Sequence, residues 1–300
     1  MARLIGVYHT LIMKRGDLNV FGMLISAMVT PFLESGEIDY ACVSQLIKQM
    51  EETKHDSIVV AGSTGEGHSL SIEEKLALFQ YVKSHTKLKV IYSISQNSIM
   101  NLKKEMEQID PLEPDGYLMV VPYYNLPPQR GIYLFFKEAA SYTKRPIIIY
   151  NVPSRTNSHI EFTTLRKLIK STKNIVGIKE ASSDVNFISL LKKNFPQFLC
   201  YAGSDREFYS FISHGADGII SVMSILYGKE MRQLYDDYKE GYHALLLDDY
   251  LKLVAELLSL ETNPIPIKYL LSQKGYPSMH VRLPLVELSS EFQREMNLLL

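Results

Sequence analysis

The chain has 300 residues, of which 46% are hydrophobic and 22% are charged, and its formal net charge is −1. This balance is typical of a globular protein and excludes a disordered or collagen-like chain. The basic excess of a nucleic-acid-binding protein is missing, so we expect no nucleic-acid partner. The length allows one large α/β domain or two small ones.

The two cysteines and the N-terminal segment bear on where the protein resides. Cys42 and Cys200 lie in apolar contexts without metal-ligand spacing, which favours buried thiols in a reducing compartment. No apolar stretch approaches the ~18 residues that span a bilayer. Residues 1–20 are mildly apolar but lack a signal-peptide pattern, so we interpret them as an N-terminal extension. We expect a cytoplasmic protein with no membrane partner.

Short β-rich apolar runs recur at the spacing of strand–helix units. Several are apolar on successive residues, which indicates strands buried on both faces of a parallel sheet. The eight predicted strands are Gly22–Thr30, Ser57–Gly62, Leu88–Ser93, Gly116–Val121, Pro146–Asn151, Ile175–Lys179, Phe198–Ala202 and Gly218–Val222.

Amphipathic segments with helix-start signals lie between these runs. Asp39 precedes one, Ser71 and Glu74 form a capping-box pattern before another, and further helical patterns begin near Glu161 and Asp184. The alternation predicts a (β/α)₈ TIM barrel over residues 21–226. A C-terminal helical region follows over 227–300, helical from 228 to about 259 and with two more helices beyond.

A doubly wound sheet is the alternative fold. It normally carries a glycine-rich phosphate turn after its first strand. The first predicted strand instead runs into Val29-Thr30-Pro31-Phe32, so the pattern favours the barrel.

In a barrel the active site forms at the C-terminal ends of the strands. Lys179 ends the sixth predicted strand. It is either a strand-end lysine that reaches solvent, or an amine partly desolvated in the barrel mouth. In the second case its pKa falls and the neutral amine can attack a carbonyl.

Residues with hydroxyl groups stand at the ends of other predicted strands. Tyr150 closes the fifth, and a chain of hydroxyls with Ser63 or Thr64 and Tyr124 could relay protons, because hydroxyls both donate and accept. Tyr123 and Tyr124 should point in opposite directions, and either could simply pack.

Two further features suit anionic substrates. The turn Gly62–Gly67 offers backbone N–H groups to a carboxylate, while the absence of a Gly-Lys-Ser/Thr motif disfavours a nucleotide phosphate. Arg155 could bind a second carboxylate in a bidentate manner. No residue set suggests a metal site.

Several motifs together resemble the 4-hydroxy-tetrahydrodipicolinate (dihydrodipicolinate) synthase family, in the N-acetylneuraminate lyase superfamily of class I aldolases. They occur in the family's order from Phe21 to the C-terminus. The motifs are Gly-Ser-Thr-Gly-Glu, Tyr-Tyr-Asn, Tyr-Asn-Val-Pro-Ser-Arg-Thr, Gly-Ile-Lys-Glu-Ala, Gly-Ile-Ile-Ser-Val, Asn-Pro-Ile-Pro-Ile-Lys and Arg-Leu-Pro-Leu. The resemblance implies condensation of pyruvate with L-aspartate 4-semialdehyde on the route to diaminopimelate and lysine, without a cofactor or metal.

The resemblance also implies roles for single residues. Lys179 would form the imine, and Tyr150, Ser63 and Tyr124 the proton relay, with Tyr124 supplied by a neighbouring subunit of a homotetramer built as a dimer of dimers. Ser63 and Thr64 would hold the pyruvate carboxylate and Arg155 that of the semialdehyde. Gly203 and Ile220 would line the pocket through their backbones.

Ser63-Thr64 departs from the family's usual Thr-Thr and is typical of the sialic-acid lyase branch. Arg155 and the pair Glu180-Ala181 after the lysine favour the synthase. A lyase or aldolase acting on N-acetylneuraminate or a 2-keto-3-deoxy sugar acid is the first alternative, and a non-catalytic binding homologue is the second.

A second departure concerns feedback by lysine. Of the histidine, asparagine and glutamate that lysine-inhibited relatives use, the asparagine persists as Asn97, whereas Ile72 and Asn101 replace the other two. Ser93-Ile94-Ser95 also replaces a Gly-Thr-Gly type of turn. We therefore expect weak or absent inhibition by lysine.

Overall fold

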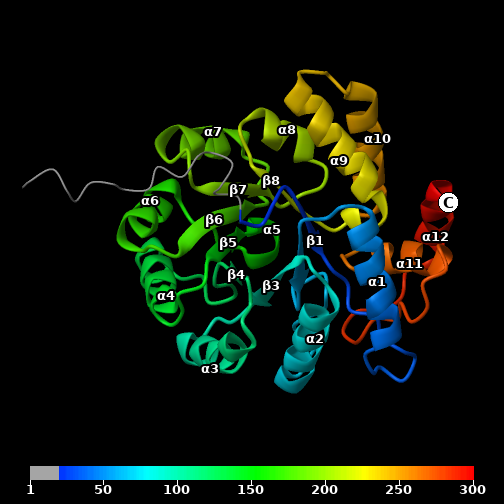
Figure 1. The fold of residues 1–300 in the computed structure, drawn as a ribbon, viewed down its shortest axis with the longest axis horizontal. Helices are drawn as coiled ribbons and strands as arrows, with labels where there is room; N and C mark the ends of the chain where they lie inside the picture. The colour runs from blue at the N-terminus through cyan, green and yellow to red at the C-terminus, as the bar shows by residue number, and fades with distance from the viewer. Residues whose placement is uncertain (1–19) are drawn as a thin grey trace, which may run out of the picture.

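The structure, a computed structural model, describes residues 20–300, so the predicted N-terminal extension lies outside the described residues except for Val20. Eight parallel strands form a closed barrel in the order β1 to β8, with β8 pairing back onto β1. Helices surround the strands (Figure 1). The predicted TIM barrel is confirmed, and the closed strand order excludes the doubly wound alternative.

Each predicted β-rich run overlaps one strand. The strands are β1 (Leu24–Ala27), β2 (Ser57–Val60), β3 (Lys89–Ile94), β4 (Gly116–Val120), β5 (Ile147–Asn151), β6 (Ile175–Glu180), β7 (Leu199–Ala202) and β8 (Gly218–Ser221). The largest difference is at β1, which was predicted over Gly22–Thr30 but is much shorter. Beyond it the chain leaves the barrel, and Phe32 forms isolated bridges with Ile38 and His280.

The helices between the strands begin where the sequence signals predict. Asp39 accepts hydrogen bonds from two backbone N–H groups at the start of α1, and Ser71 and Glu74 form the predicted capping box of α2. These helices are α1 (Tyr40–Glu52), α2 (Ile72–His85), α3 (Ile99–Ile109), α4 (Gln129–Ser141), α5 (Pro153–Thr156), α6 (Phe162–Ser171), α7 (Val185–Asn194), α8 (Phe208–Ser213) and α9 (Ser224–Glu240), with a 3₁₀ turn η1 (Asp110–Leu112) after α3.

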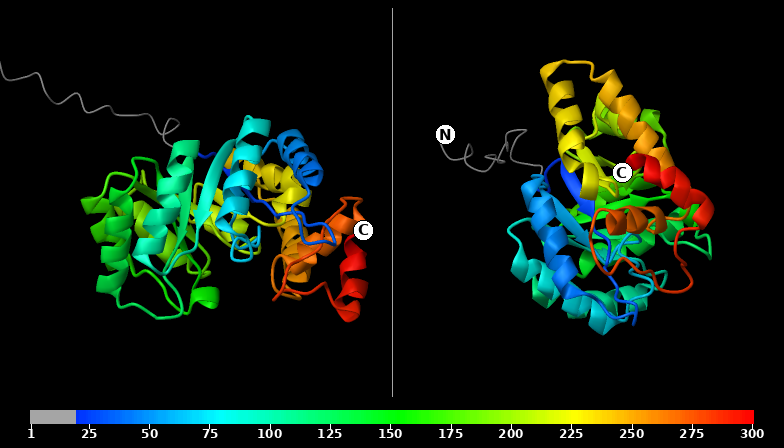
Figure 2. Two further views of the ribbon diagram at one scale, coloured as in Figure 1. Left: turned by 90° about the horizontal axis from the view of Figure 1, so that it is seen from below. Right: turned by 90° about the vertical axis from the view of Figure 1, so that its right-hand side faces the viewer.

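The C-terminal region adds α10 (Leu245–Leu257), α11 (Ile265–Gln273), α12 (Ser290–Met296) and the 3₁₀ turn η2 (Asn297–Leu299). The segment predicted as helical from 228 to about 259 is two helices, because Gly241 adopts a left-handed φ of 88° that ends α9. The predicted domain boundary after residue 226 falls inside α9, beside the non-helical Tyr227. α9 and α10 form a hairpin (Figures 1 and 2), and the loop after α11 reaches the start of α1, where Ser278 Oγ donates to Asp39.

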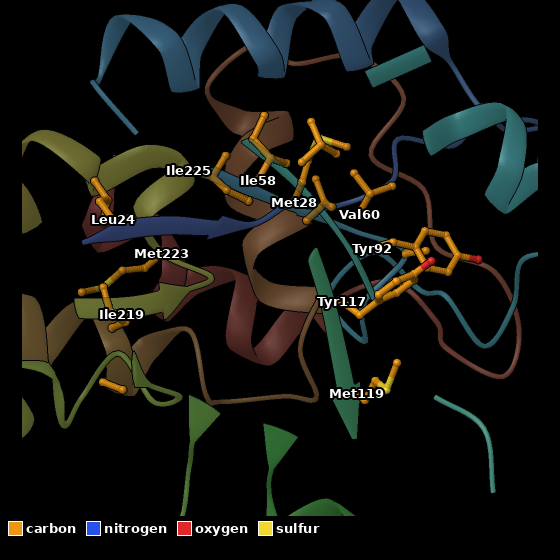
Figure 3. Packing of buried hydrophobic residues seen from close by; sticks show 14 of the residues in the cluster. Leu24, Met28, Ile58, Val60, Tyr92, Tyr117, Met119, Ile219, Met223 and Ile225 are labelled. Atoms are coloured by element: carbon orange, nitrogen blue, oxygen red, sulfur yellow. The ribbon is translucent and has the colours of Figure 1, made fainter. Parts of the chain in front are cut away.

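Strand residues alternate between two cores. The outer core lies between barrel and helices, where Figure 3 shows Leu24, Ile58 and Ile219 among its members. Tyr92 and Tyr117 meet there edge to face with ring centroids 6.5 Å apart. The inner core fills the barrel with residues of opposite parity, namely Ile25, Ala27, Val59, Ile91, Leu118, Ile148, Leu199, Tyr201 and Ile220, together with Phe21. This packed interior leaves space for a ligand only at the ends of the strands.

Aspartates tie the N-terminal ends of the strands together. Asp56 accepts from the backbone N–H groups of Met23 and Leu24 and pairs with Arg232 of α9. Asp115 and Asp217 make equivalent backbone contacts at the starts of β3 and β7. These bonds fix the strand register at the end of the barrel opposite the candidate site.

In the described part of the chain, no helix combines the length and apolar character needed to cross a membrane.

Candidate active site

Lys179 lies where two cavities meet at the C-terminal ends of the strands. One cavity, here called the β3-side cavity, has a volume of about 310 Å³ and extends past Ser93 and Ser95. The other, the β7-side cavity, has a volume of about 540 Å³ and extends past Gly203 and Asp205. Residues shared by both walls are Ser63, Thr64, Tyr150, Val152, Arg155, Lys179 and Asn263. Five of the eight residues predicted for the site therefore line both cavities, and Gly203 lines one of them.

The side chain of Lys179 is buried, with 5% relative exposure, which excludes a lysine that reaches solvent. Burial lowers the pKa of its amine to about 8, Asp205 opposes this shift and Arg155 adds to it. The ammonium lies 4.4 Å from the centre of the Tyr150 ring. A substantial fraction of this amine is thus neutral near physiological pH, as a carbonyl nucleophile requires.

Tyr150 and Lys179 are register partners on β5 and β6, so both side chains enter the barrel mouth at one level. Burial raises the pKa of the Tyr150 phenol, while Arg155 and a hydrogen bond with Ser63 lower it. The phenol therefore stays protonated at neutral pH. It can donate and accept next to the amine.

The turn Gly62–Gly67 is held in an unusual backbone conformation. Glu66 has a left-handed φ of 50°, and a Cβ on Gly67 would lie 2.0 Å from the carbonyl oxygen of Ala61. Thr30 Oγ1 donates to the Gly65 carbonyl at 2.6 Å. Buried Glu66 pairs with buried Lys268 of α11 at 2.5 Å and accepts from the backbone N–H of Arg282. These contacts fix the position of Ser63 and Thr64 at the cavity wall.

Asn263, from the loop between α10 and α11, connects the two sides of the mouth. Its Nδ2 donates to Thr64 Oγ1 at 2.9 Å. Its backbone carbonyl accepts from Nη2 of Arg155 at 3.5 Å. The C-terminal region thus positions both predicted carboxylate-binding residues.

Gly203 lines the β7-side cavity as predicted, and it must be glycine because a Cβ there would lie 2.7 Å from Cβ of Ala181. Ile220 lies in the inner core and lines neither cavity. Val222, two residues later, contributes to the cavity wall instead.

Tyr123 and Tyr124 point in different directions, as expected. Tyr123 lines the β3-side cavity, its ring 5.9 Å from that of His68, whereas Tyr124 is 91% exposed with a left-handed φ of 68°. Within one chain, Tyr124 therefore does not enter the site that contains Lys179.

Of the positions considered for lysine feedback, Asn97 contacts a residue that lines the β3-side cavity. Asn97 Oδ1 accepts from the backbone N–H of Tyr123 at 3.0 Å, and so supports the strand end. Ile72 is the first residue of α2, and Asn101 is an exposed residue of α3. Weak feedback by lysine stays a prediction.

Sequence reasoning gave no role to Asp205 or Asn263. Asp205 was recognised only as a strand-end residue and Asn263 only as part of a motif. The position of Asp205 directly after β7 could have identified it as a residue of the site. The contact between Asn263 and Thr64, in contrast, depends on the tertiary structure. Within residues 20–300, no group of three or more His, Cys, Asp and Glu side chains is arranged to hold a metal ion.

The buried amine gives a prediction for its titration. Because burial disfavours the ammonium form, Lys179 should lose its proton around pH 8, well below the ~10.4 of a free lysine side chain. NMR of protein labelled with ¹³C at lysine Cε would follow this titration, and Lys179→Arg would assign the signal. A midpoint for Lys179 near that of free lysine would contradict the account.

Comparisons with known proteins agree on one family. Residues 20–300 match the sequence model of the Dihydrodipicolinate synthetase family. The 4-hydroxy-tetrahydrodipicolinate synthase of Dehalococcoides mccartyi (strain ATCC BAA-2266 / KCTC 15142 / 195) is 38% identical over 271 residues, covering 89% of this chain and 91% of that one. The Bacillus subtilis (strain 168) enzyme of the same name is 36% identical over 276 residues, covering 90% and 95%.

A solved structure agrees with these relatives. The crystal structure of DHDPS from Cyanidioschyzon merolae with lysine bound superimposes with a TM-score of 0.90 at 34% identity, covering 93% of this chain and 97% of that chain. The fold, the matched length and the sequence identity lead to one conclusion. This chain belongs to the dihydrodipicolinate synthetase family.

Proposed function

We propose that this protein condenses pyruvate with L-aspartate 4-semialdehyde to give 4-hydroxy-tetrahydrodipicolinate, through an imine on Lys179. The reaction belongs to the biosynthesis of diaminopimelate and lysine. The observation that carries the proposal is the buried Lys179 amine beside the Tyr150 phenol, in a chain whose relatives are synthases of this name. No cofactor or metal is needed, because the lysine itself activates the ketone.

The first step uses the neutral amine that burial makes available. The lone pair of Lys179 Nζ attacks the carbonyl carbon of pyruvate, and the carbonyl oxygen takes up a proton to form a carbinolamine. A second proton turns the hydroxyl into water, which leaves as the carbon–nitrogen double bond forms. Loss of a methyl proton from the iminium then gives an enamine, whose carbon attacks the aldehyde carbon while the aldehyde oxygen takes up a proton. The amino group of the semialdehyde then attacks the iminium carbon, which closes the ring and releases the Lys179 amine.

These steps need proton transfers at the bound three-carbon unit. Tyr150, next to Lys179 and hydrogen-bonded to Ser63, is the group placed to exchange them. The family usually has threonine where this chain has Ser63. Serine supplies the same hydroxyl group, so the proton relay is chemically complete.

Two separate groups suit the two carboxylates. Thr64 and the backbone of the turn Gly62–Gly67 would hold the carboxylate of pyruvate close to Lys179. Arg155 is exposed at the mouth and would hold the carboxylate of the incoming aldehyde. This arrangement favours a small acidic aldehyde over a polyhydroxylated sugar acid, whose hydroxyl groups would need neutral partners.

Tyr124 would complete the relay from a second copy of the chain. Its exposed ring, with Leu126 two residues later also exposed, would be covered in a tight dimer, and two dimers would form the tetramer. Sedimentation analysis should then give an oligomer at micromolar concentration. A monomer that keeps full activity would contradict this assignment.

Turnover measurements test the function directly. The purified protein should consume pyruvate with L-aspartate 4-semialdehyde at least ~100-fold faster than it cleaves N-acetylneuraminate, because Arg155 favours an acidic partner. Lys179→Arg should abolish both activities while leaving the circular dichroism spectrum unchanged, since it retains the charge but cannot form the imine. Preferential cleavage of N-acetylneuraminate would establish the alternative lyase function.

A further inference from the structure

Asn151 and Glu180 form a buried pair directly after the two residues that the proposed mechanism uses. They are register partners on β5 and β6, as Tyr150 and Lys179 are one position earlier. Because side chains alternate along a strand, the pair points away from the barrel interior, on the other face of the strand ends that carry the reacting groups. The relative exposures of Asn151 and Glu180 are 3% and 0%.

Glu180 is held in place by amide and hydroxyl donors. Asn151 Nδ2 donates to both carboxylate oxygens, at 3.0 and 2.8 Å, and the backbone N–H of Ser182 donates to Oε1 at 2.8 Å. Burial raises the pKa of Glu180, and hydrogen bonds from Asn151, Ser182 and the backbone of Ala181 lower it. A buried carboxylate that relies on these donors is sensitive to the loss of any one of them.

Asn151 connects this carboxylate to the loop between α5 and α6. Its Oδ1 accepts from the backbone N–H of Ile160 at 3.1 Å, and its backbone carbonyl accepts from the N–H of Ala181 at 2.9 Å. The carbonyl of Glu180 accepts from the backbone N–H of Gly203 at 2.7 Å. The ends of β5, β6 and β7 are therefore joined around these two side chains.

The contact between Tyr150 and Lys179 leaves little tolerance for movement of the strand ends. The ammonium lies 4.4 Å from the centre of the Tyr150 ring. A misplacement of about 1 Å at a reacting group can cost about 100-fold in rate. Burial raises the pKa of the Tyr150 phenol, and the Glu180 carboxylate adds to this rise. The pair is thus linked to the phenol both by geometry and by charge.

We propose that Asn151 and Glu180 are positioning residues, whose hydrogen bond fixes the ends of β5 and β6 so that the Tyr150 phenol and the Lys179 amine stay within proton-transfer distance. The inference rests on the proposed function and adds residues that act without touching the substrate. Asn151 and Glu180 line neither of the two cavities. Loss of their contact should therefore slow proton transfer more than it weakens pyruvate binding.

The test uses substitutions that change the pair without changing its size. Glu180→Gln puts an amide N–H₂ in place of one accepting oxygen. One donor then faces another donor whichever way the two amides are turned, because the N–H groups of Ser182 and Ile160 need the remaining oxygens. Adding Asn151→Asp supplies an acceptor for the new N–H₂ and restores a carboxylate–amide pair of the same net charge.

Pyruvate alone provides the readout, since formation and reversal of the enamine exchange its methyl hydrogens with deuterium in D₂O, which ¹H NMR follows. At saturating pyruvate, the exchange rate should fall about 10- to 100-fold in Glu180→Gln and return to within ~3-fold of wild type in the double variant. KM for pyruvate should change less than ~3-fold in both. Glu180→Asp, which keeps the carboxylate but shortens its reach, should lower the rate about 3- to 10-fold and decides the question if Glu180→Gln does not fold.

Asn174→Ala is the matched control, because Asn174 Nδ2 donates to the backbone carbonyls of Ala140 and Thr143 before the start of β6. It should lower the midpoint of thermal unfolding and leave the exchange rate unchanged. An unchanged rate in the folded Glu180 variants, or a folded double variant that does not recover, would overturn the proposal. An equal loss in Asn174→Ala would also overturn it, since general destabilisation would then explain the effect. A wild-type protein that exchanges no methyl hydrogens would instead defeat the proposed function.

Discussion

The buried ion pair between Glu66 and Lys268 is the interaction on which the geometry of the site depends. Glu66 occupies a left-handed conformation, which costs a non-glycine residue about 1–3 kcal/mol and persists only where surrounding contacts enforce it. Lys268 and the backbone N–H of Arg282 supply those contacts from the C-terminal region. Arg282 also bonds to Glu74 of α2, so the chain after the barrel is fastened to the segment that follows β2.

This attachment explains why the C-terminal region matters to a site formed by barrel strands. Removing one partner of such a pair leaves a buried charge and costs about 3–5 kcal/mol. The consequence would be local as well as global, because Ser63 and Thr64 precede Glu66 by only a few residues. Asn263 adds a second connection, from the same region to Thr64 and Arg155. The region after β8 therefore positions Thr64 and Arg155 at the cavity walls.

The reactivity assigned to Lys179 comes from the same enclosure. The barrel interior below it is filled by side chains such as Ile148, Leu199 and Ile220, so the amine is desolvated while its upper side faces the cavities. Desolvation favours the neutral form, and nearby Asp205 limits the shift. The pKa near 8 is the result of these opposing effects.

Much of this arrangement could be predicted from sequence, since repeated apolar runs and capping signals determine a barrel and strand ends determine where its site lies. That rule predicted Lys179, Tyr150, Ser63, Thr64 and Arg155, and the structure places all five at the walls of the two cavities. What local pattern could not supply was side-chain direction and contact between distant segments. The side chain of Ile220 points into the inner core, and that of Tyr124 is exposed outside its own site. Asn263 contacts Thr64, which lies 199 positions away in the sequence.

The same limit hid the partners of Glu66, because a Gly-Ser-Thr-Gly-Glu turn does not reveal that a lysine some 200 residues later neutralises its carboxylate. The division of the helical segment at Gly241 was a simpler omission. A glycine within a helical pattern is compatible with either a continuous helix or a C-cap, and its left-handed φ decided between them.

The central claim is that Lys179 forms a covalent imine with pyruvate. Incubation with pyruvate and sodium borohydride, followed by proteolysis and mass spectrometry, would locate a reduced adduct. The account predicts the mass increment of a reduced pyruvate imine on the peptide containing Lys179, and its loss in Lys179→Arg. Reduction that modifies other lysines and leaves Lys179 unmodified would contradict the account.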